Sequence, residues 1–181
     1  MGTIKATNIE PIADNGTVTL GSSGDTLTVP SGVTVAGAMA NTPAFRAYQN
    51  SAQSLGNTTQ TVISYGVESY DTDNCYSTST YRFTPNKAGK YLIGMSIRFD
   101  NVNSARTIGY IYKNSSPVAI SEEWSDSGGG PDNHPQCTTI VEMNGSTDYV
   151  EARAYHDKGF AVNSGIVGEV TYFFGQRLIG V

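Results

Sequence analysis

The sequence predicts an all-β protein whose main domain is an antiparallel sandwich. Only 15% of the 181 residues are charged, while 20 are glycine and 11 are tyrosine, a composition that favours strands and turns. Several segments alternate apolar and polar residues with a period of two, and clusters of Asn, Gly, Pro and Ser separate them. No segment has a defensible helical pattern, so we expect two layers of strands.

The clearest strand lies within Arg82–Phe99, after a turn through Pro85 and Gly89. Apolar side chains occupy its odd positions, namely Tyr91, Ile93, Met95, Ile97 and Phe99. This pattern predicts a strand with one face in the core. Leu92 is an apolar residue on the second face, which indicates that this face also meets another surface, such as a neighbouring subunit.

Residues 1–41 differ in composition and residue pattern from the rest of the chain. They contain almost no aromatic residues and repeat a short alternation of Thr with Val or Leu, at Thr17–Leu20, Thr26–Val29 and Val33–Val35. The pattern predicts short strands with too few apolar side chains to form a core alone, so the segment must pack on its own domain, on copies of itself or on another protein. A disordered tail is the alternative. We interpret residues 1–41 as a β-rich anchor or shaft and residues 42–181 as a head.

The head is predicted to contain longer, aromatic-rich strands. In Asp148–His156 the small residues Val150, Ala152 and Ala154 share one face, which suits close packing against an opposite sheet. Two long connections, Ser125–Gln136 and Asp157–Gly168, are expected to be functional or mobile. The predicted strand segments are Pro43–Gln49, Thr59–Asp71, Tyr91–Phe99, Thr107–Asn114, Pro117–Trp124, Cys137–Asn144, Asp148–His156 and Val170–Val181.

Charge and hydropathy argue against two classes of partner. The net charge is −5, and no cluster of Lys and Arg is present to neutralise phosphates, so we expect no nucleic-acid binding. No run of 18 apolar residues could span a bilayer, and the N-terminal segment lacks the pattern of a Sec-type export signal. We therefore expect a soluble chain without membrane insertion.

Five blocks of the head follow one another in a recognisable order: AFRAYQNSAQS, YDTDNCYSTSTYRFTPNKAGKYLIGMSIRF, YKN, NGSTDYVEARAY and TYFFGQRLIG. Over about residues 43–181 the chain resembles the globular-head family of the first complement component, which shares a jelly roll with tumour necrosis factor. The strongest match is F-T-P-x-x-A-G-x-Y at Phe83–Tyr91. The closing strand departs from the family pattern by one extra residue between Gly175 and Leu178.

The resemblance implies a ten-stranded, two-sheet jelly roll that works as a homotrimer, with one sheet of each subunit facing the three-fold axis. Leu92, Tyr172, Phe173 and Phe174 are the candidate interface residues. The adjacent Phe173 and Phe174 must point to opposite faces of their strand, so one of them points away from its own core.

Residues 2–37 look like the leading segments of bacteriophage structural proteins, which resemble a trimeric β shaft or anchor. With the head, this likeness predicts a non-enzymatic virion protein that is assembled in the host cytoplasm. It would attach to a major capsid or tail protein through residues 1–41 and serve as capsid decoration, cement or a short fibre. The alternative is a tail fibre or lectin-like module that binds a host receptor protein or glycan.

Trp124 is the strongest candidate for a binding surface. It lies at the mouth of the Ser125–Gln136 connection, near Asp126, Asp132 and His134, and an aromatic residue with polar neighbours suits a sugar or protein contact. The alternative is that Trp124 caps the end of the core.

Asp71, Asp73 and Asn74 form the one candidate cation site. Their loop could offer oxygen atoms to calcium, but the full spacing of a calcium loop is absent, and an Asp and Asn turn stabilised by its own backbone is the alternative. We expect no other cofactor.

The remaining chemistry-bearing residues predict no catalytic site. His134 and His156 are expected to be solvent-exposed, and no serine-elbow or zinc-protease motif accompanies them. Glu122 and Glu123 should point to opposite faces of a strand. Cys75 and Cys137 lack metal-ligand spacing, and we favour free thiols over a disulfide.

Overall fold

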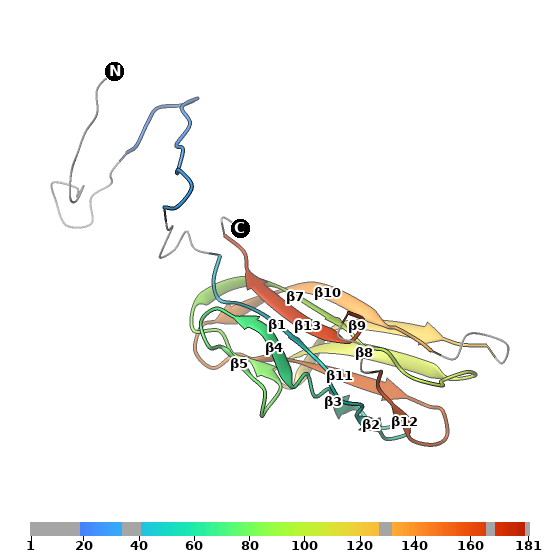
Figure 1. The fold of residues 1–181 in the computed structure, drawn as a ribbon. Coiled ribbons are helices and arrows are strands. Elements are labelled where there is room, and N and C mark those ends of the chain that lie inside the picture. The colour runs from blue at the N-terminus through green and yellow to red at the C-terminus, as the bar shows by residue number, and fades with distance from the viewer. Residues whose placement is uncertain (1–18, 34–40, 127–131, 166–168, 180–181) are drawn as a thin grey trace. The chain divides into compact units, whose positions relative to one another are not determined.

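The computed structural model describes residues 19–33, 41–126, 132–165 and 169–179 of a chain that forms two compact units, Met1–Ala36 and Gly37–Val181. The described part of the larger unit contains strands and no helix (Figure 1). Its strands are β1 (Ala44–Tyr48), β2 (Ser54–Leu55), β3 (Thr61–Val62), β4 (Val67–Asp71), β5 (Tyr76–Ser77), β6 (Arg82–Phe83), β7 (Ala88–Ser96), β8 (Arg106–Lys113), β9 (Ser116–Trp124), β10 (Gln136–Asn144), β11 (Val150–His156), β12 (Val162–Asn163) and β13 (Tyr172–Arg177).

Two antiparallel sheets face each other across the core (Figure 1). The five-stranded sheet has the order β10-β7-β13-β1-β4, and the six-stranded sheet has the order β5-β6-β11-β8-β9 with β3 also paired to β11. Strands β12 and β2 form a small third sheet. The predicted two-sheet jelly roll is confirmed. The strand number differs from ten because the predicted strand Thr59–Asp71 divides into β3 and β4, and because the two-residue strands β2, β5, β6 and β12 lie outside the predicted strand segments.

Strand β7 lies inside the five-stranded sheet, hydrogen-bonded to β10 on one side and β13 on the other. The odd-numbered side chains from Tyr91 to Phe99 are all buried, as the alternation predicts. Leu92 is half-buried on the opposite face. The period-two pattern therefore gives the correct orientation of this strand.

An aromatic cluster fills one part of the core between the sheets. The Phe45 ring lies 4.4 Å from Phe83, 4.8 Å from Tyr76 and 5.1 Å from Phe173, measured between ring centroids. The buried hydroxyl of Tyr65 donates a 2.9 Å hydrogen bond to the carbonyl of Ser96. Burial raises the pKa of Tyr65 well above its ordinary value. These contacts fix the distance between the sheets.

Strand β11 supplies the small residues that let the sheets pack closely. Val150, Ala152 and Ala154 are buried in the core, as predicted from their alternation. Glu151, Arg153 and Tyr155 alternate with them and point to the outward face of the six-stranded sheet. This outward face carries the charged and aromatic groups described below.

The described residues of the smaller unit contain turns but no strand. Ser22 and Asp25 close one turn, in which the Asp25 amide donates to the Ser22 carbonyl at 3.0 Å and the Ser22 amide donates to the Asp25 carboxylate at 2.6 Å. The predicted strand at Thr26–Val29 is therefore not formed in the single chain. Its isolated pairs of apolar side chains find no second layer there. The predicted strands Thr17–Leu20 and Val33–Val35 lie largely outside the described residues.

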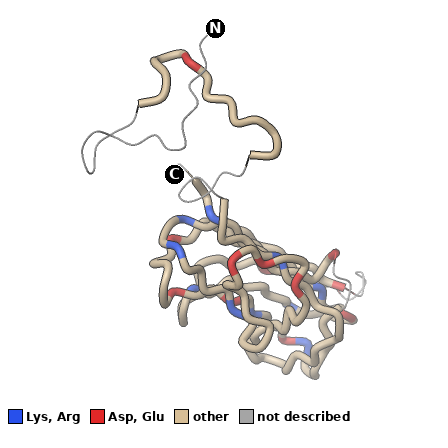
Figure 2. The backbone as a smooth tube through the Cα atoms, turned by 60° about the vertical axis from the view of Figure 1, so that its left-hand side comes forward, with Lys and Arg blue, Asp and Glu red and all other residues tan. Residues whose placement is uncertain are grey.

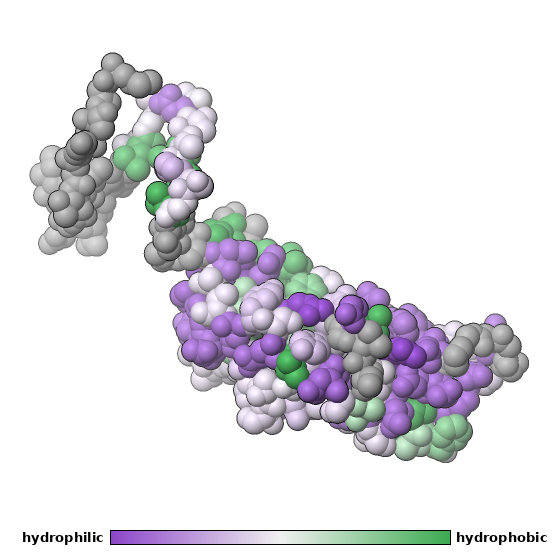
Figure 3. Space-filling model, viewed as in Figure 1, coloured by the Kyte–Doolittle hydropathy of each residue, from purple (hydrophilic) through white to green (hydrophobic). Residues whose placement is uncertain are grey.

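Among the described residues, charges of both signs are mixed on the head. Acidic and basic positions are interspersed along the head, while the described tail is almost uncharged (Figure 2). On the side of the head turned to the viewer in Figure 3, hydrophilic residues dominate and apolar residues form small separate patches. No helix among the described residues is long and apolar enough to cross a membrane.

Candidate functional site

The outward face of the five-stranded sheet carries most of the predicted interface residues. Tyr172 and Phe174 alternate with buried residues along β13, and their ring centroids lie 6.2 Å apart. Phe174 covers the backbone of Gly94, where an added Cβ would lie 2.3 Å from the Phe174 ring. Gly94 thus lets the ring lie flat across β7. The result is a pair of half-buried aromatic rings on the side of the sheet that faces away from the core.

Cross-strand pairing extends this surface across neighbouring strands. Ile140 on β10 pairs with Leu92 on β7, and Leu92 pairs with Gln176 on β13. The Arg46 guanidinium lies 5.2 Å from the Tyr172 ring centroid and donates to the Ser69 hydroxyl. We call the set Leu92, Ile140, Tyr172 and Phe174 the apolar face.

Phe173 does not belong to the apolar face, which corrects its assignment as an interface candidate. Its side chain is fully buried and packs on Phe45 and Tyr65. Pairing of Phe173 with Met95 and of Phe174 with Gly94 sets which of the two points inward. A side chain with no exposed area in the single chain has none to bury against a neighbour.

A second group of residues meets on the outward face of the six-stranded sheet, around Trp124 at the end of β9. The indole is 69% exposed, so Trp124 does not cap the core. Its Nε1–H donates a 2.6 Å hydrogen bond to the Glu122 carboxylate. Arg106 pairs with Trp124 across β8 and β9, and its guanidinium carbon lies 5.7 Å from the indole centroid.

Arg106 connects Trp124 to strand β11. Its guanidinium carbon lies 5.3 Å from the Tyr155 ring centroid, and its Nε lies 3.6 Å from an Asp157 carboxylate oxygen. A hydrogen bond with Tyr155 raises the pKa of Arg106, so this side chain remains a cation at any physiological pH. We call Arg106, Glu122, Trp124, Tyr155 and Asp157 the Trp124 cluster.

The other predicted members of this surface have different roles. Asp126 is exposed just beyond Trp124. Asp132 accepts a 2.7 Å hydrogen bond from Arg98, and the His134 backbone amide donates to Glu123 at 2.8 Å.

Glu123 and Glu122 alternate along β9, so the contacts of His134 lie toward the inner side of that strand. The structure therefore separates the structural roles of Asp132 and His134 from the cluster. Sequence reasoning missed Arg106 and Tyr155 as neighbours of Trp124, because only the pairing of β8 with β9 and β11 brings them together.

The carboxylates of the predicted cation site form hydrogen bonds and an ion pair with other groups of the protein. Asp71 accepts from the backbone amides of Asp73 and Tyr76, at 3.4 Å and 2.8 Å. Asp73 forms a 2.9 Å ion pair with Lys87, and Asn74 has a positive φ of 52°. These contacts favour the alternative, a turn stabilised by its own backbone. Within the described ranges, no group of three or more His, Cys, Asp or Glu residues is arranged to hold a metal.

His156 is fully buried, which corrects the expectation that both histidines are exposed. Its Nε2 lies 3.0 Å from the Leu55 carbonyl, and its Nδ1 accepts from the Lys158 amide at 3.3 Å. The two ring nitrogens therefore link β2 to the segment that follows β11. His156 is a structural residue in this arrangement.

Cys75 and Cys137 are free thiols in the structure, in agreement with the sequence. Burial raises the pKa of Cys137 to about 11, and it also raises the pKa of Cys75. Both thiols are therefore protonated and unreactive at neutral pH.

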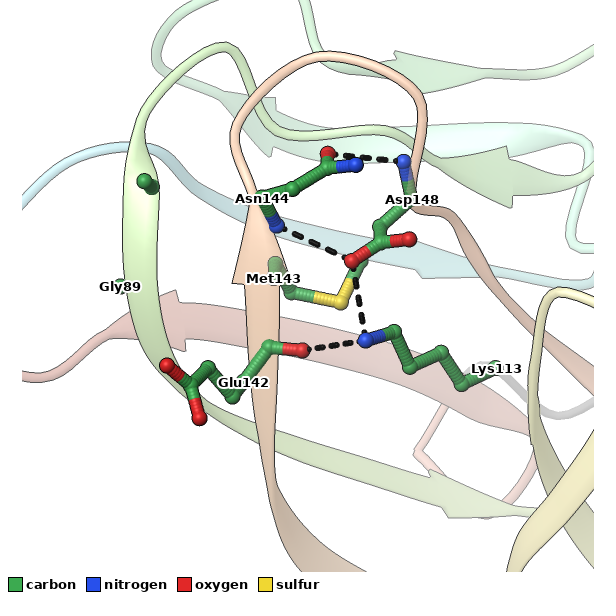
Figure 4. A pocket seen from close by; sticks show the side chains of 7 residues that line it. Gly89, Lys113, Glu142, Met143, Asn144 and Asp148 are labelled. Atoms are coloured by element: carbon green, nitrogen blue, oxygen red, sulfur yellow. Dashed lines mark hydrogen bonds and ion pairs between the residues drawn. The ribbon is translucent and has the colours of Figure 1, made fainter.

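A shallow pocket of about 360 Å³ lies where β7 begins and where β8 and β10 end (Figure 4). Lys113 points across it to the Glu142 carbonyl at 2.7 Å and to the Asp148 carboxylate at 2.9 Å. Hydrogen bonds from Lys113 and Asn114 lower the pKa of Asp148. Lys113 and Asn114 at the end of β8 thus join the turn between β10 and β11.

Known structures share the fold of the head. Murine APRIL at pH 5.0 superposes with a TM-score of 0.59 and 9% identity, covering 75% of this chain and 98% of that one. Eiger TNF from S. frugiperda gives 0.58 and 11%, covering 78% of this chain and 96% of that one. The globular domain of zebrafish complement 1qA gives 0.56 and 13%, with 75% and 96% coverage.

The head therefore has the jelly-roll fold of the tumour necrosis factor and complement globular heads. At these identities the likeness concerns the fold alone. No protein-family model matches the sequence, and no curated protein matches it either.

Proposed function

We propose that the protein is a non-enzymatic, homotrimeric structural protein of a bacteriophage particle, held on the particle by residues 1–41 and displaying the jelly-roll head. The observation that carries the trimer is the apolar face. Leu92, Phe174 and Tyr172 lie on the side of the five-stranded sheet away from the core, and Ile140 beside them is 59% exposed. Contiguous apolar surface of this kind marks an interaction site.

A three-fold ring requires that two different surfaces of the same chain meet. The apolar face supplies one surface. Strand β9 forms an edge of the six-stranded sheet, and its Val118 and Ile120 side chains are 40% and 57% exposed. We propose that this edge of one subunit packs on the apolar face of the next.

The smaller unit supports attachment to a partner. Leu20, Leu27, Val29 and Val33 are all exposed in the single chain, and no strand pairing covers them. Exposed apolar side chains gain free energy when a second surface removes them from water. We propose that this second surface belongs to a major capsid or tail protein. The segment would bind it either as a single chain or as a shaft of three chains. The sequence likeness to phage leader segments supports this choice of partner.

The head has two possible tasks on a particle. An exposed head held on the particle through residues 1–41 suits capsid decoration or cement. The exposed Trp124 cluster favours the second candidate, recognition of a host-surface glycan or protein by a short fibre. Both tasks use the same trimer and the same attachment segment.

Antibody labelling of purified particles in the electron microscope tests the proposal and separates the tasks. Label over the whole shell supports decoration, and label at the tail supports a fibre. Full-length chain should also rebind to particles that have lost it, while a variant lacking residues 1–41 should not. Absence of the chain from purified particles would overturn the structural role.

A further inference from the structure

Trp124 is the most exposed large apolar side chain among the described residues of the head, at 69%. It lies on the outward face of the six-stranded sheet, whereas the apolar face belongs to the other sheet. An exposed indole contributes little to the stability of its own chain. Tryptophan is also enriched where a protein contacts a binding partner.

The indole is held in one orientation. The 2.6 Å hydrogen bond to Glu122 fixes the edge of the ring, and Arg106 lies against it with 5.7 Å between the guanidinium carbon and the ring centroid. Arg106 is itself held by Tyr155 and by the 2.8 Å hydrogen bond from its backbone amide to Asp157. A ligand that binds a ring already held in place loses less side-chain entropy on binding.

The polar groups around the ring define the class of ligand. Glu122 and Asp157 flank the single cation Arg106, and Asp126 is exposed nearby, so the local charge is negative. An anionic ligand would be repelled. A cationic ligand would compete with Arg106, which already lies beside the indole.

A neutral ligand with hydroxyl groups fits both features. Its C–H surface would lie on the exposed indole, and its hydroxyls would donate to carboxylate oxygens and exchange hydrogen bonds with the Tyr155 hydroxyl. A few fixed polar groups beside an aromatic surface give such a site its specificity.

We infer that the Trp124 cluster is a binding site for a neutral saccharide, with Trp124 as the stacking platform and Glu122 as the main hydroxyl acceptor. This inference deepens the receptor-binding form of the proposed function and rests on it for its biological role. Binding itself requires only the head, because every member of the cluster comes from one chain.

Trp124 is the sole tryptophan of the chain, so its fluorescence reports directly on the site. The full chain is titrated with neutral saccharides, namely glucose, galactose, mannose and N-acetylglucosamine with their oligomers. Sialyllactose serves as an anionic probe and pentalysine as a cationic one. We expect a saturable change in emission with at least one neutral saccharide and none with the charged probes.

Calorimetry with the saccharide that binds then tests the residues. Trp124→Ala should weaken binding about tenfold or more, and Glu122→Gln should weaken it while leaving an acceptor for the indole N–H. The matched control is Phe160→Ala, which removes an aromatic side chain of similar exposure, 61%, outside the cluster. It should leave the affinity unchanged.

The inference is overturned if no neutral saccharide changes the emission, if pentalysine is the probe that binds, or if Trp124→Ala binds as well as the parent chain. Light scattering on the same samples keeps the two proposals apart. A trimer that binds no saccharide contradicts the site alone, and a monomer that binds one contradicts the assembly alone.

Discussion

The outward faces of the two sheets both carry aromatic residues, but they differ in how those residues are covered. On the six-stranded sheet the Arg82, Arg153 and Arg106 guanidinium groups lie 4.0 Å, 4.3 Å and 5.3 Å from the rings of Tyr149, Tyr112 and Tyr155. On the five-stranded sheet, Leu92, Phe174 and Ile140 form a surface of apolar side chains. The tyrosines of the first face are covered by arginines of the same chain, while the second face gains most from a partner.

Glu151 links two arginines of the first face. Its carboxylate is fully buried and bonds Arg82 at 2.7 Å and Arg153 at 2.5 Å. One acidic residue thus holds two of the arginines that cover tyrosines. Among the described residues, the comparable stack on the five-stranded sheet is that of Arg46 on Tyr172.

Substitution of the adjacent Phe173 and Phe174 should give the largest difference in stability between the two faces. Phe173→Ala should lower the free energy of unfolding by about 3–5 kcal/mol, because it removes a fully buried ring from the aromatic cluster. Phe174→Ala should cost the isolated chain much less and mainly weaken association. Urea denaturation at low concentration measures both, and equal losses would contradict the assignment of the two faces.

Removal of the Glu151 charge tests whether the six-stranded face depends on its own ion pairs. Glu151→Gln leaves two arginines without their carboxylate, and we expect a loss of about 2 kcal/mol, below the range for a fully buried pair because both arginines are partly exposed. Glu142→Gln is the control, since this exposed side chain should change stability by less than about 0.5 kcal/mol. If the two variants unfold alike, the ion pairs do not hold this face.

Alkaline pH should weaken the core of the five-stranded sheet. The pKa of Cys137 rises from 9.0 to about 11 on folding, so the unfolded chain loses this proton first and stability falls as pH rises from about 9 to 11. Allowing for partial exposure, the loss from this group is about 1–2 kcal/mol. In Cys137→Ala the decline over this interval should be smaller, and an identical pH profile would contradict the assignment.

Trp124→Ala should have the smallest effect on stability. The ring is mostly exposed, so we expect a change within about 0.5 kcal/mol in the free energy of unfolding. Thermal unfolding followed by circular dichroism measures it. A loss comparable with that of Phe173→Ala would mean that Trp124 caps the core after all.

The sequence predicted those features that depend on local alternation. The buried face of β7 and the small face of β11 follow from period-two patterns, and both are confirmed. Alternation could not tell which of Phe173 and Phe174 points inward, because the direction depends on the pairing of β13 with β7. For the same reason Arg106 and Tyr155 could not be assigned to Trp124.

Two further differences also come from tertiary packing. His156 reads as a polar residue at a strand end, yet the Leu55 carbonyl and the Lys158 amide satisfy its ring in the interior. Thr26–Val29 has the alternation of a strand, but it has no pairing partner in the single chain. Strand pairing within an assembled shaft stays a prediction.

The mass of the chain in solution tests the central claim most directly. Light scattering at micromolar concentration should give three times the 19.2 kDa of one chain, and Leu92→Arg should shift the mass toward one chain because it places a charge on the apolar face. A parent chain that remains a folded monomer at this concentration would contradict the account.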